Sequence, residues 1–191
     1  EFGVTRIALG ERTFAPLQEY GFSRVRAAVD CLLHVLYIEE KYDFVRQNYL
    51  AFCDASKRHA TEWDAGGGEE SVRYAKSELN RHIVNILTTT KLYFDQSIRH
   101  ASKLDRLVES SDINLVAQTH AQYGARLGYR VMEALRNYVQ HRGDAVHTAS
   151  FGWEKARLES GALGPSFRIA DLYLDPAKLR EDKKFKVEVL N

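Results

Sequence analysis

Two long stretches of this chain contain neither proline nor glycine, and this feature limits the fold more than any other. Residues 22–63 and 69–123 lack both residue types, and the whole 191-residue sequence has only 3 prolines. Proline and glycine interrupt helices, whereas folds with many tight turns use them often. The sequence therefore predicts a mainly α fold, and its hydrophobic content of 45% is enough to bury a core.

Apolar residues in these stretches recur at steps of three and four, as one face of a helix requires. We expect the first helix to start near Phe22 and to be one long helix, or two helices with a break near Lys41. A second helix is expected over residues 69–108 and a third over residues 113–140. The three glycines in the segment 64–68 predict a linker between the first two helices.

The two ends of the chain differ in character from the middle. Near the N-terminus, the residues Val4, Ile7 and Leu9 favour a short strand. Residues 150–165 contain three glycines and one proline, which is typical of a loop-rich region. Alternating apolar residues after this region, at 167–169 and 185–189, predict two strands that pair with each other or with the N-terminal strand.

These changes divide the chain into three parts. Residues 1–21 form an N-terminal extension, residues 22–148 a helical bundle, and residues 149–191 a C-terminal appendage of loops and strands. The last residues, 186–191, resemble the middle of a strand, so we expect the natural chain to continue beyond them. The expected fold is an antiparallel helical bundle with a small β or irregular C-terminal appendage.

Charge and cysteine content narrow the classes of function. The net charge is +1, which argues against a surface coated with positive charge, although a local basic site is still allowed. Cys31 and Cys53 lack the spacing of a disulfide framework or of a zinc site, so we expect buried thiols in a reducing compartment, the cytoplasm. No apolar run is long enough to span a bilayer, and we expect no membrane association, metal or cofactor.

The end of the third predicted helix divides cleanly into an apolar and a polar arc. The polar arc holds Arg130, Glu133, Arg136, Asn137, Gln140 and His141. A polar arc is usually only solvated surface. The composition of this one favours phosphate binding instead, because a guanidinium, a carboxamide and an imidazole lie near one helix end. His141 lies in the last turn, where the helix dipole stabilises a protonated imidazole.

The pattern Arg136-Asn137-x-x-x-His141 resembles the Arg-x4-6-His signature of the HEPN superfamily. The segment Arg142 to His147 fits the bare pattern too, but Gly143 interrupts the helix there, so we discount this second copy. The resemblance implies an antiparallel HEPN-like bundle over residues 22–148. It also implies a homodimer in which two copies of the motif face each other across a shared cleft.

Many HEPN domains are metal-independent endoribonucleases of toxin–antitoxin, abortive-infection and CRISPR defence systems. The resemblance implies that RNA is cleaved by attack of the ribose 2′-hydroxyl on the adjacent phosphate. His141 would act as general base or acid, Arg136 would stabilise charge on the phosphate oxygens, and Asn137 would orient His141 or bind the phosphate. Glu133 would fix Arg136 or Asn137. An antitoxin or other regulatory protein is a further expected partner.

Other polar residues are weaker candidates for substrate binding: Asn80, Arg81, Gln140 and His147. Asparagine is unfavourable inside a helix, so Asn80 has either a binding role or a structural hydrogen bond, and we favour the structural bond. Two alternatives to the nuclease stay open. One is a non-catalytic helical module that binds nucleic acid or a protein partner, and the other is a purely structural bundle.

Overall fold

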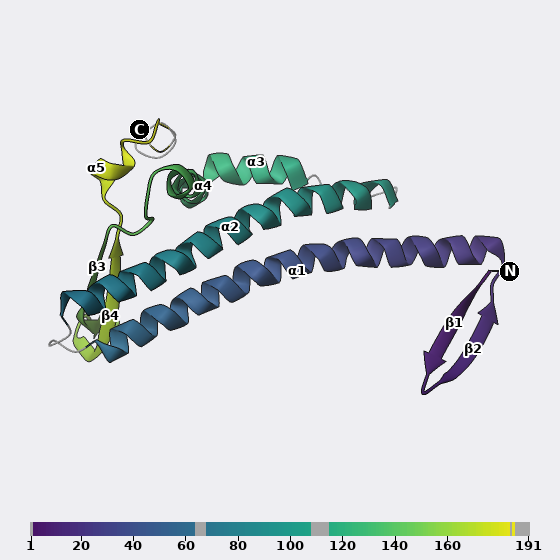
Figure 1. The fold of residues 1–191 in the computed structure, drawn as a ribbon, viewed down its shortest axis with the longest axis horizontal. Coiled ribbons are helices and arrows are strands. Elements are labelled where there is room, and N and C mark those ends of the chain that lie inside the picture. Colours follow the sequence, from purple (N-terminus) through teal and green to yellow (C-terminus); the bar gives the residue numbers. More distant parts are fainter. Residues whose placement is uncertain (1, 64–67, 108–114, 184, 186–191) are drawn as a thin grey trace.

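The computed structural model describes residues 2–63, 68–107, 115–183 and 185, and it is mainly helical (Figure 1). The elements are, in chain order, β1 (Gly3–Ala8), β2 (Glu11–Pro16), α1 (Glu19–Glu62), α2 (Glu69–Leu107), α3 (Leu115–Ala125), α4 (Leu127–His141), β3 (Thr148–Arg157), β4 (Leu163–Tyr173) and α5 (Pro176–Leu179).

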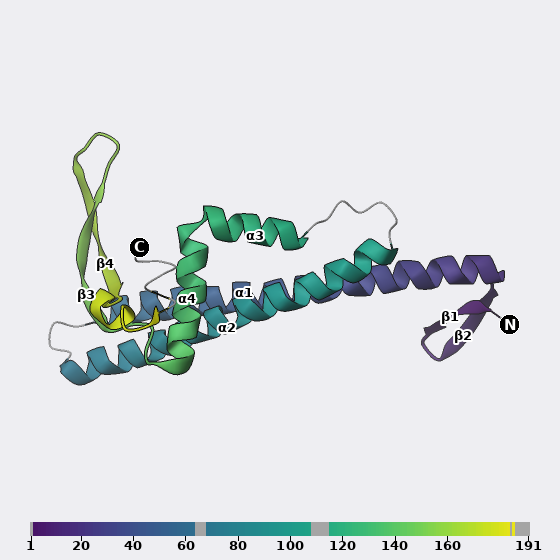
Figure 2. The ribbon, with the colours of Figure 1, turned by 90° about the horizontal axis from the view of Figure 1, so that it is seen from above.

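Two long antiparallel helices form the body of the molecule. Helix α1 runs without a break through Lys41, so the alternative of two separate helices is wrong. Helix α2 has nearly the predicted bounds and lies beside α1 over most of its length (Figures 1 and 2). Many of the residues that the two helices bury are small, which lets two backbones approach closely: Ala55, Ala60, Ala75, Ser97 and Ala101.

The third predicted helix is wrong as a single element, because the chain forms two helices there. Arg126 separates α3 from α4 with an extended backbone, φ −116° and ψ 107°. Gly124 and Gly128 flank this position, and glycine weakens a helix by about 1 kcal/mol relative to alanine. Two glycines within five residues therefore lower the free-energy cost of interrupting the helix here. Figure 2 shows that α4 crosses α2, whereas α3 continues along it.

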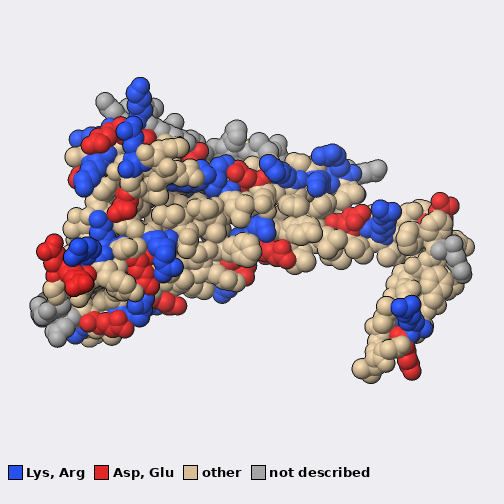
Figure 3. All heavy atoms as spheres, in the orientation of Figure 1, with Lys and Arg blue, Asp and Glu red and all other residues tan. Residues whose placement is uncertain are grey.

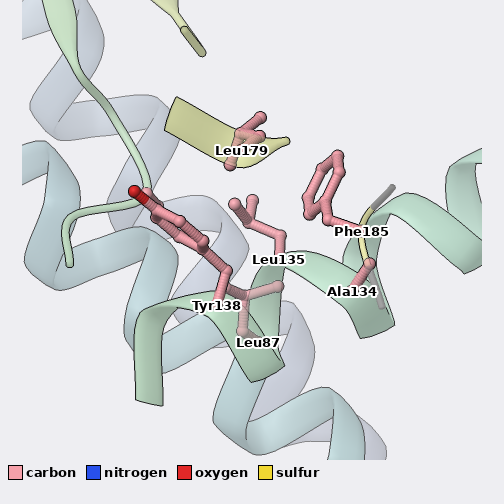
Figure 4. Packing of buried hydrophobic residues seen from close by; sticks show 7 residues of the cluster. Leu87, Ala134, Leu135, Tyr138, Leu179 and Phe185 are labelled. Carbon is pink, nitrogen blue, oxygen red and sulfur yellow. The ribbon is translucent and has the colours of Figure 1, made fainter. Parts of the chain in front are cut away.

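Helix α4 packs into the main apolar core of the described chain. Its buried residues Ala134, Leu135 and Tyr138 contact Leu87 of α2 on one side. The C-terminal part of the chain closes the other side (Figure 4), through Ala145, Leu179 and Phe185. This cluster fixes the position of α4 between α2 and α5, and with it the directions of the polar residues on α4.

The two β-hairpins are separate sheets at separate places in the molecule. Strands β1 and β2 pair around Leu9 and Gly10, whose φ angles of 50° and 85° fit a tight two-residue hairpin turn. The predicted loop over 150–165 is wrong, because most of it belongs to β3 and β4, and only residues 158–162 connect the two strands. The predicted strand at 167–169 is confirmed as part of β4, but its predicted pairing with 185–189 or with the N-terminal strand is wrong, because β4 pairs with β3 and the N-terminal strand β1 pairs with β2.

Some sequence predictions fall outside the described residues. These are most of the glycine linker at 64–68, the break near 110–112 and the end of the chain at 186–191. Cys31 and Cys53 are free thiols on α1, and both are half-buried rather than fully buried. Within the described ranges, no helix combines the length and the hydropathy needed to cross a membrane.

A pair of histidines joins α1 to α2 far from the main core. The Nδ1 atoms of His34 and His100 lie 3.0 Å apart, and the ring of Tyr37 lies 5.0 Å from that of His100. A hydrogen bond between two Nδ1 atoms requires that one carries a proton and the other does not. Burial, followed by His34, Lys103 and Lys41, lowers the pKa of His100 below its ordinary value of 6.5.

We predict that this pair makes folding stability depend on pH. The lowered pKa of His100 means that the unfolded chain takes up a proton more readily than the folded chain. The stabilisation should therefore be complete above pH 6.5 and be lost as the pH falls through the lowered pKa. Urea unfolding at a series of pH values checks this. His100→Asn should flatten the dependence, whereas His141→Gln, at an exposed position, should not. An equally steep profile in His100→Asn would contradict the prediction.

Candidate functional site

The polar arc of helix α4 is partly half-buried and partly exposed. Ala134, Leu135 and Tyr138 face the core, so the side chains between and beyond them point away from it. Arg136 and Asn137 are half-buried at the edges of that contact, whereas Gln140 and His141 are exposed in the last turn. The polar arc is therefore not uniformly solvated, and its members differ in what they can bind.

Arg136 lines a cavity between α2 and α4. The cavity has a volume of about 360 Å³, and its wall is largely apolar, with Leu87, Phe94, Ile98, Tyr129 and Met132. Polar groups join this wall from both helices: Thr90, Lys91, Asp95, Glu133 and Arg136. Its size and lining are those of a site for a small molecule or for one group of a larger ligand.

The guanidinium of Arg136 is incompletely satisfied. Its Nε atom is buried and has no hydrogen-bond partner among the described residues. A buried donor without an acceptor costs about 1–3 kcal/mol, and more when the group is charged. Tyr129, on the same cavity wall, forms an edge-to-face contact with Phe94 at 5.1 Å. Burial, and then Glu133 and Asp95, raise the pKa of Tyr129, so this phenol is neutral at neutral pH.

The side chains of Asn137 and His141 do not line the cavity beside Arg136. The Asn137 amide donates a long hydrogen bond of 3.5 Å to Asp182, which follows α5. His141 is exposed in the last turn of α4, just before Arg142 ends the helix by donating its N–H to Tyr138 O at 2.8 Å. Residues five apart on a helix lie about 140° apart around its axis. Arg136 and His141 of one chain therefore lie on different sides of α4.

Two of the weaker candidates have clear structural partners. The side chain of Asn80 is buried and exchanges two hydrogen bonds with the backbone of Val146, at 3.1 Å and 2.7 Å. In His147, Nδ1 accepts from the Asp175 N–H at 2.9 Å and Nε2 lies 3.2 Å from the Tyr138 hydroxyl. Both side chains fix the segment that follows α4, and neither lines the cavity at Arg136.

The neutral form of His147 fits this position. Burial, and then Lys178, lower the pKa of His147 below its ordinary value. With Nδ1 accepting from a backbone N–H, the proton belongs on Nε2, which then donates to the Tyr138 hydroxyl. His147 thus holds the end of α4 to the turn before α5. The discounted motif from Arg142 to His147 lies outside any helix, because α4 ends at His141.

A second polar cluster was missed by the sequence analysis. Glu78 on α2 bonds Arg58 and His59 of α1, both at 2.8 Å, and Arg81 lies 3.5 Å away. Burial alone would raise the pKa of Glu78, but the bonds from Arg58 and His59 outweigh it and lower that pKa. Arg81, expected near the substrate, thus contacts this cluster. No spacing within one helix could have revealed a pairing between two helices.

The structure therefore brings Arg136 and Glu133 together on one cavity wall and leaves Gln140 and His141 exposed beyond it. Asn80, Arg81 and His147 lie in other contacts. In the described part of the chain, no group of three or more His, Cys, Asp or Glu side chains is placed to hold a metal ion. No protein-family model, curated protein or solved structure matches this chain.

We predict that Asn80→Ala lowers the free energy of unfolding by about 1–3 kcal/mol. The substitution leaves the buried N–H and C=O of Val146 without partners. Asn80→Asp keeps the acceptor but removes the donor, so it should also destabilise. Asn48→Ala is the control, because the Asn48 side chain donates to Phe44 O of its own helix, and it should change stability by less than about 0.5 kcal/mol. Equal effects of Asn80→Ala and Asn48→Ala in urea unfolding would refute the assignment.

Proposed function

We propose that the chain is a metal-independent endoribonuclease of a bacterial defence or toxin–antitoxin type, with Arg136, Asn137 and His141 as catalytic residues. The observation that carries this proposal is Arg136, whose side chain lines a cavity and whose buried Nε has no hydrogen-bond partner among the described residues. A ligand that supplies an acceptor would remove the cost of that unmade bond. A phosphate oxygen is such an acceptor, because the planar guanidinium fits phosphate well.

In the proposed reaction, His141 takes the proton from a ribose 2′-hydroxyl, and the resulting oxygen attacks the adjacent phosphorus. The bond from phosphorus to the 5′-oxygen of the next nucleotide breaks, which leaves a 2′,3′-cyclic phosphate and, after protonation, a 5′-hydroxyl. Arg136 stabilises the charge that develops on the non-bridging oxygens. The exposed position of His141 supports its part, since an RNA strand can reach the imidazole without displacing other side chains.

The cavity beside Arg136 offers a place for a base of the RNA. Phe94 and Tyr129 contribute aromatic faces or edges on which an unpaired base can stack. Glu133 lines the same wall, and Gln140 lies one turn beyond Arg136 at the exposed end of α4. We therefore keep Glu133 and Gln140 as substrate-binding residues. Asn80, Arg81 and His147 support the fold around the site instead.

The large exposed surface of the chain supports a homodimer. The chain exposes 13653 Å², whereas a compact folded chain of 21.8 kDa exposes about 9,300 Å². The excess, roughly 4,400 Å², is more than one protomer buries in most stable dimers. Exposed apolar residues follow one another along the first half of α1, and they include Val25, Val29, Leu32, Leu33, Leu36 and Tyr37.

The charges around this apolar surface favour a second copy in antiparallel orientation. Arg24 and Arg26 precede the centre of the surface at Leu32, and Glu39 and Glu40 follow it at a similar distance. An antiparallel pair of α1 helices would place the arginines of each copy beside the glutamates of the other, whereas a parallel pair would oppose like charges. Because Leu32 lies near the His34–His100 contact and α4 packs at Leu87, this pairing leaves the two α4 helices far apart, so the shared cleft at Arg136 and His141 needs a second contact between copies. The same surface supports the alternative function, a non-catalytic module that binds a protein partner such as an antitoxin.

We predict RNA cleavage in the presence of EDTA, with 2′,3′-cyclic phosphate ends. His141→Ala should lower the rate at least about 100-fold, since it removes the acid–base group. Arg136→Ala should lower it about 100-fold to 1,000-fold by removing charge stabilisation. Arg142→Ala is the matched control, because it removes an exposed positive charge next to His141 without touching the cavity. Denaturing gels and mass spectrometry of the products measure these effects.

Several outcomes would end the nuclease proposal. Cleavage that survives in His141→Ala would point to a contaminating ribonuclease. RNA binding without cleavage, weakened by Arg136→Ala, would favour the non-catalytic module.

Mixing Arg136→Ala protein with His141→Ala protein tests the shared cleft. We expect activity to return, because Arg136 and His141 of one chain lie on different sides of α4.

We predict that the chain is a dimer and that Leu32→Lys raises its dissociation constant at least about tenfold, because a lysine would be buried without a partner. Leu158→Lys is the control, since Leu158 is an exposed leucine between β3 and β4. Arg26→Glu should weaken the dimer, and adding Glu39→Arg to the same chain should restore it. Sedimentation equilibrium measures each mass. A monomeric parent protein, or equal effects at Leu32 and Leu158, would exclude this surface.

A further inference from the structure

A second cavity lies at the end of the molecule where α1 ends and α2 begins, away from Arg136. Its volume is about 470 Å³. Residues from α1, the segment just after it, α2 and β3 line this cavity, and six of them carry the argument: His59, Glu62, Trp63, Glu70, Tyr74 and Phe151. None of them belongs to the proposed nuclease site, so the cavity needs an explanation of its own.

Aromatic rings form much of the wall of this cavity. Trp63 and Phe151 stack with ring centroids 5.1 Å apart and an angle of 23° between their planes. His59 meets Tyr74 edge-to-face at 5.9 Å, and it lies 6.4 Å from Phe151. The bond of 2.8 Å from His59 to Glu78 fixes the imidazole in place. The rings thus form a connected group that is anchored at its buried end.

Two carboxylates line this cavity, those of Glu62 and Glu70. Glu62 also interacts with Arg58 one helical turn earlier and helps to raise the pKa of that guanidinium. Two arginines in this region already have partners. Arg58 bonds Glu78, and Arg168 donates to the backbone carbonyls at the end of α1. Figure 3 shows acidic and basic side chains close together at this end of the molecule.

The helix ends do not reverse this charge. The carboxyl end of α1 carries a partial negative charge, and the amino end of α2 carries a partial positive charge. Glu69 and Glu70, in the first turn of α2, offset the positive end. The charged side chains that line the cavity are carboxylates. An anion would meet two acidic side chains there, whereas a cation would meet complementary charge.

We propose that this cavity binds a small organic cation with an alkylated ammonium head, such as a quaternary ammonium group. The faces of Trp, Tyr and Phe rings attract cations through their negative π-systems. An alkylated ammonium has few or no N–H groups that need acceptors, and its methyl groups fit an apolar wall. Arg168, which lies 4.8 Å from the Trp153 ring centre, shows the same kind of contact elsewhere in this chain.

The test uses Trp63 as a fluorescent reporter. The chain has 2 tryptophans, so Trp153→Phe leaves Trp63 as the only one. This protein is titrated at constant ionic strength with tetramethylammonium chloride, with choline chloride, and with 3,3-dimethyl-1-butanol, which is the uncharged analogue of choline. We expect a saturable change with both cations and at least about tenfold weaker binding of the alcohol, because it lacks the charge that the rings attract.

Matched variants separate a built site from general attraction to an acidic surface. Glu62→Gln and Glu70→Gln should each weaken choline binding about twofold to fivefold. Glu69→Gln removes an equally exposed charge from the same helix turn, but Glu69 does not line the cavity, so binding should stay within about twofold. Trp63→Leu, with its fold checked by circular dichroism, should abolish saturation transfer from the protein to the choline methyl protons.

Three results would overturn the proposal. Equal binding of choline and its uncharged analogue would mean that the cavity is only an apolar pocket. A change that never saturates would mean that no site exists. A loss in Glu69→Gln as large as that in Glu70→Gln would mean that the cation is attracted by the surface in general. None of these measurements depends on ribonuclease activity.

Discussion

The rest of the described structure depends on helix α2, because other elements pack against several of its sides. Helix α1 lies along one side of it, and α3, α4 and β3 contact it elsewhere (Figures 1 and 2). A helix is only about 10–12 Å across with its side chains, so one helix can support several neighbours but cannot cover them fully. This explains why α2 buries residues along its length from Ala75 to Ala101, whereas the first half of α1 stays exposed.

Much of the fold could be predicted from local patterns, and the errors have physical reasons. The absence of proline and glycine predicted the two long helices, because helix formation depends mainly on residues close in sequence. The break at Arg126 was missed, since the apolar pattern continues through it and only the two flanking glycines weaken the helix. The glycines in 150–165 also led to the wrong prediction of a loop. Gly152 and Gly164 instead lie within the strands β3 and β4, which pair with each other.

The candidate site was predictable only where it depends on one helix. The division of α4 into an apolar and a polar arc correctly predicted that Arg136 and His141 lie outside the core, because the sequence of a single helix shows which side faces the core. It could not show that Arg136 reaches a cavity formed with α2, or that Asn80 bonds Val146, 66 residues away. The cavity near Trp63 was missed for the same reason, since its rings come from segments distant in sequence.

Arg168 holds the carboxyl end of α1 by donating to the carbonyl oxygens of Thr61 and Trp63. At the opposite end of this helix, the hairpin of β1 and β2 projects away from the body of the molecule (Figure 1). A helix of 44 residues is about 66 Å long. At this length, a difference of a few degrees in the direction of α1 would displace the far hairpin by several ångströms.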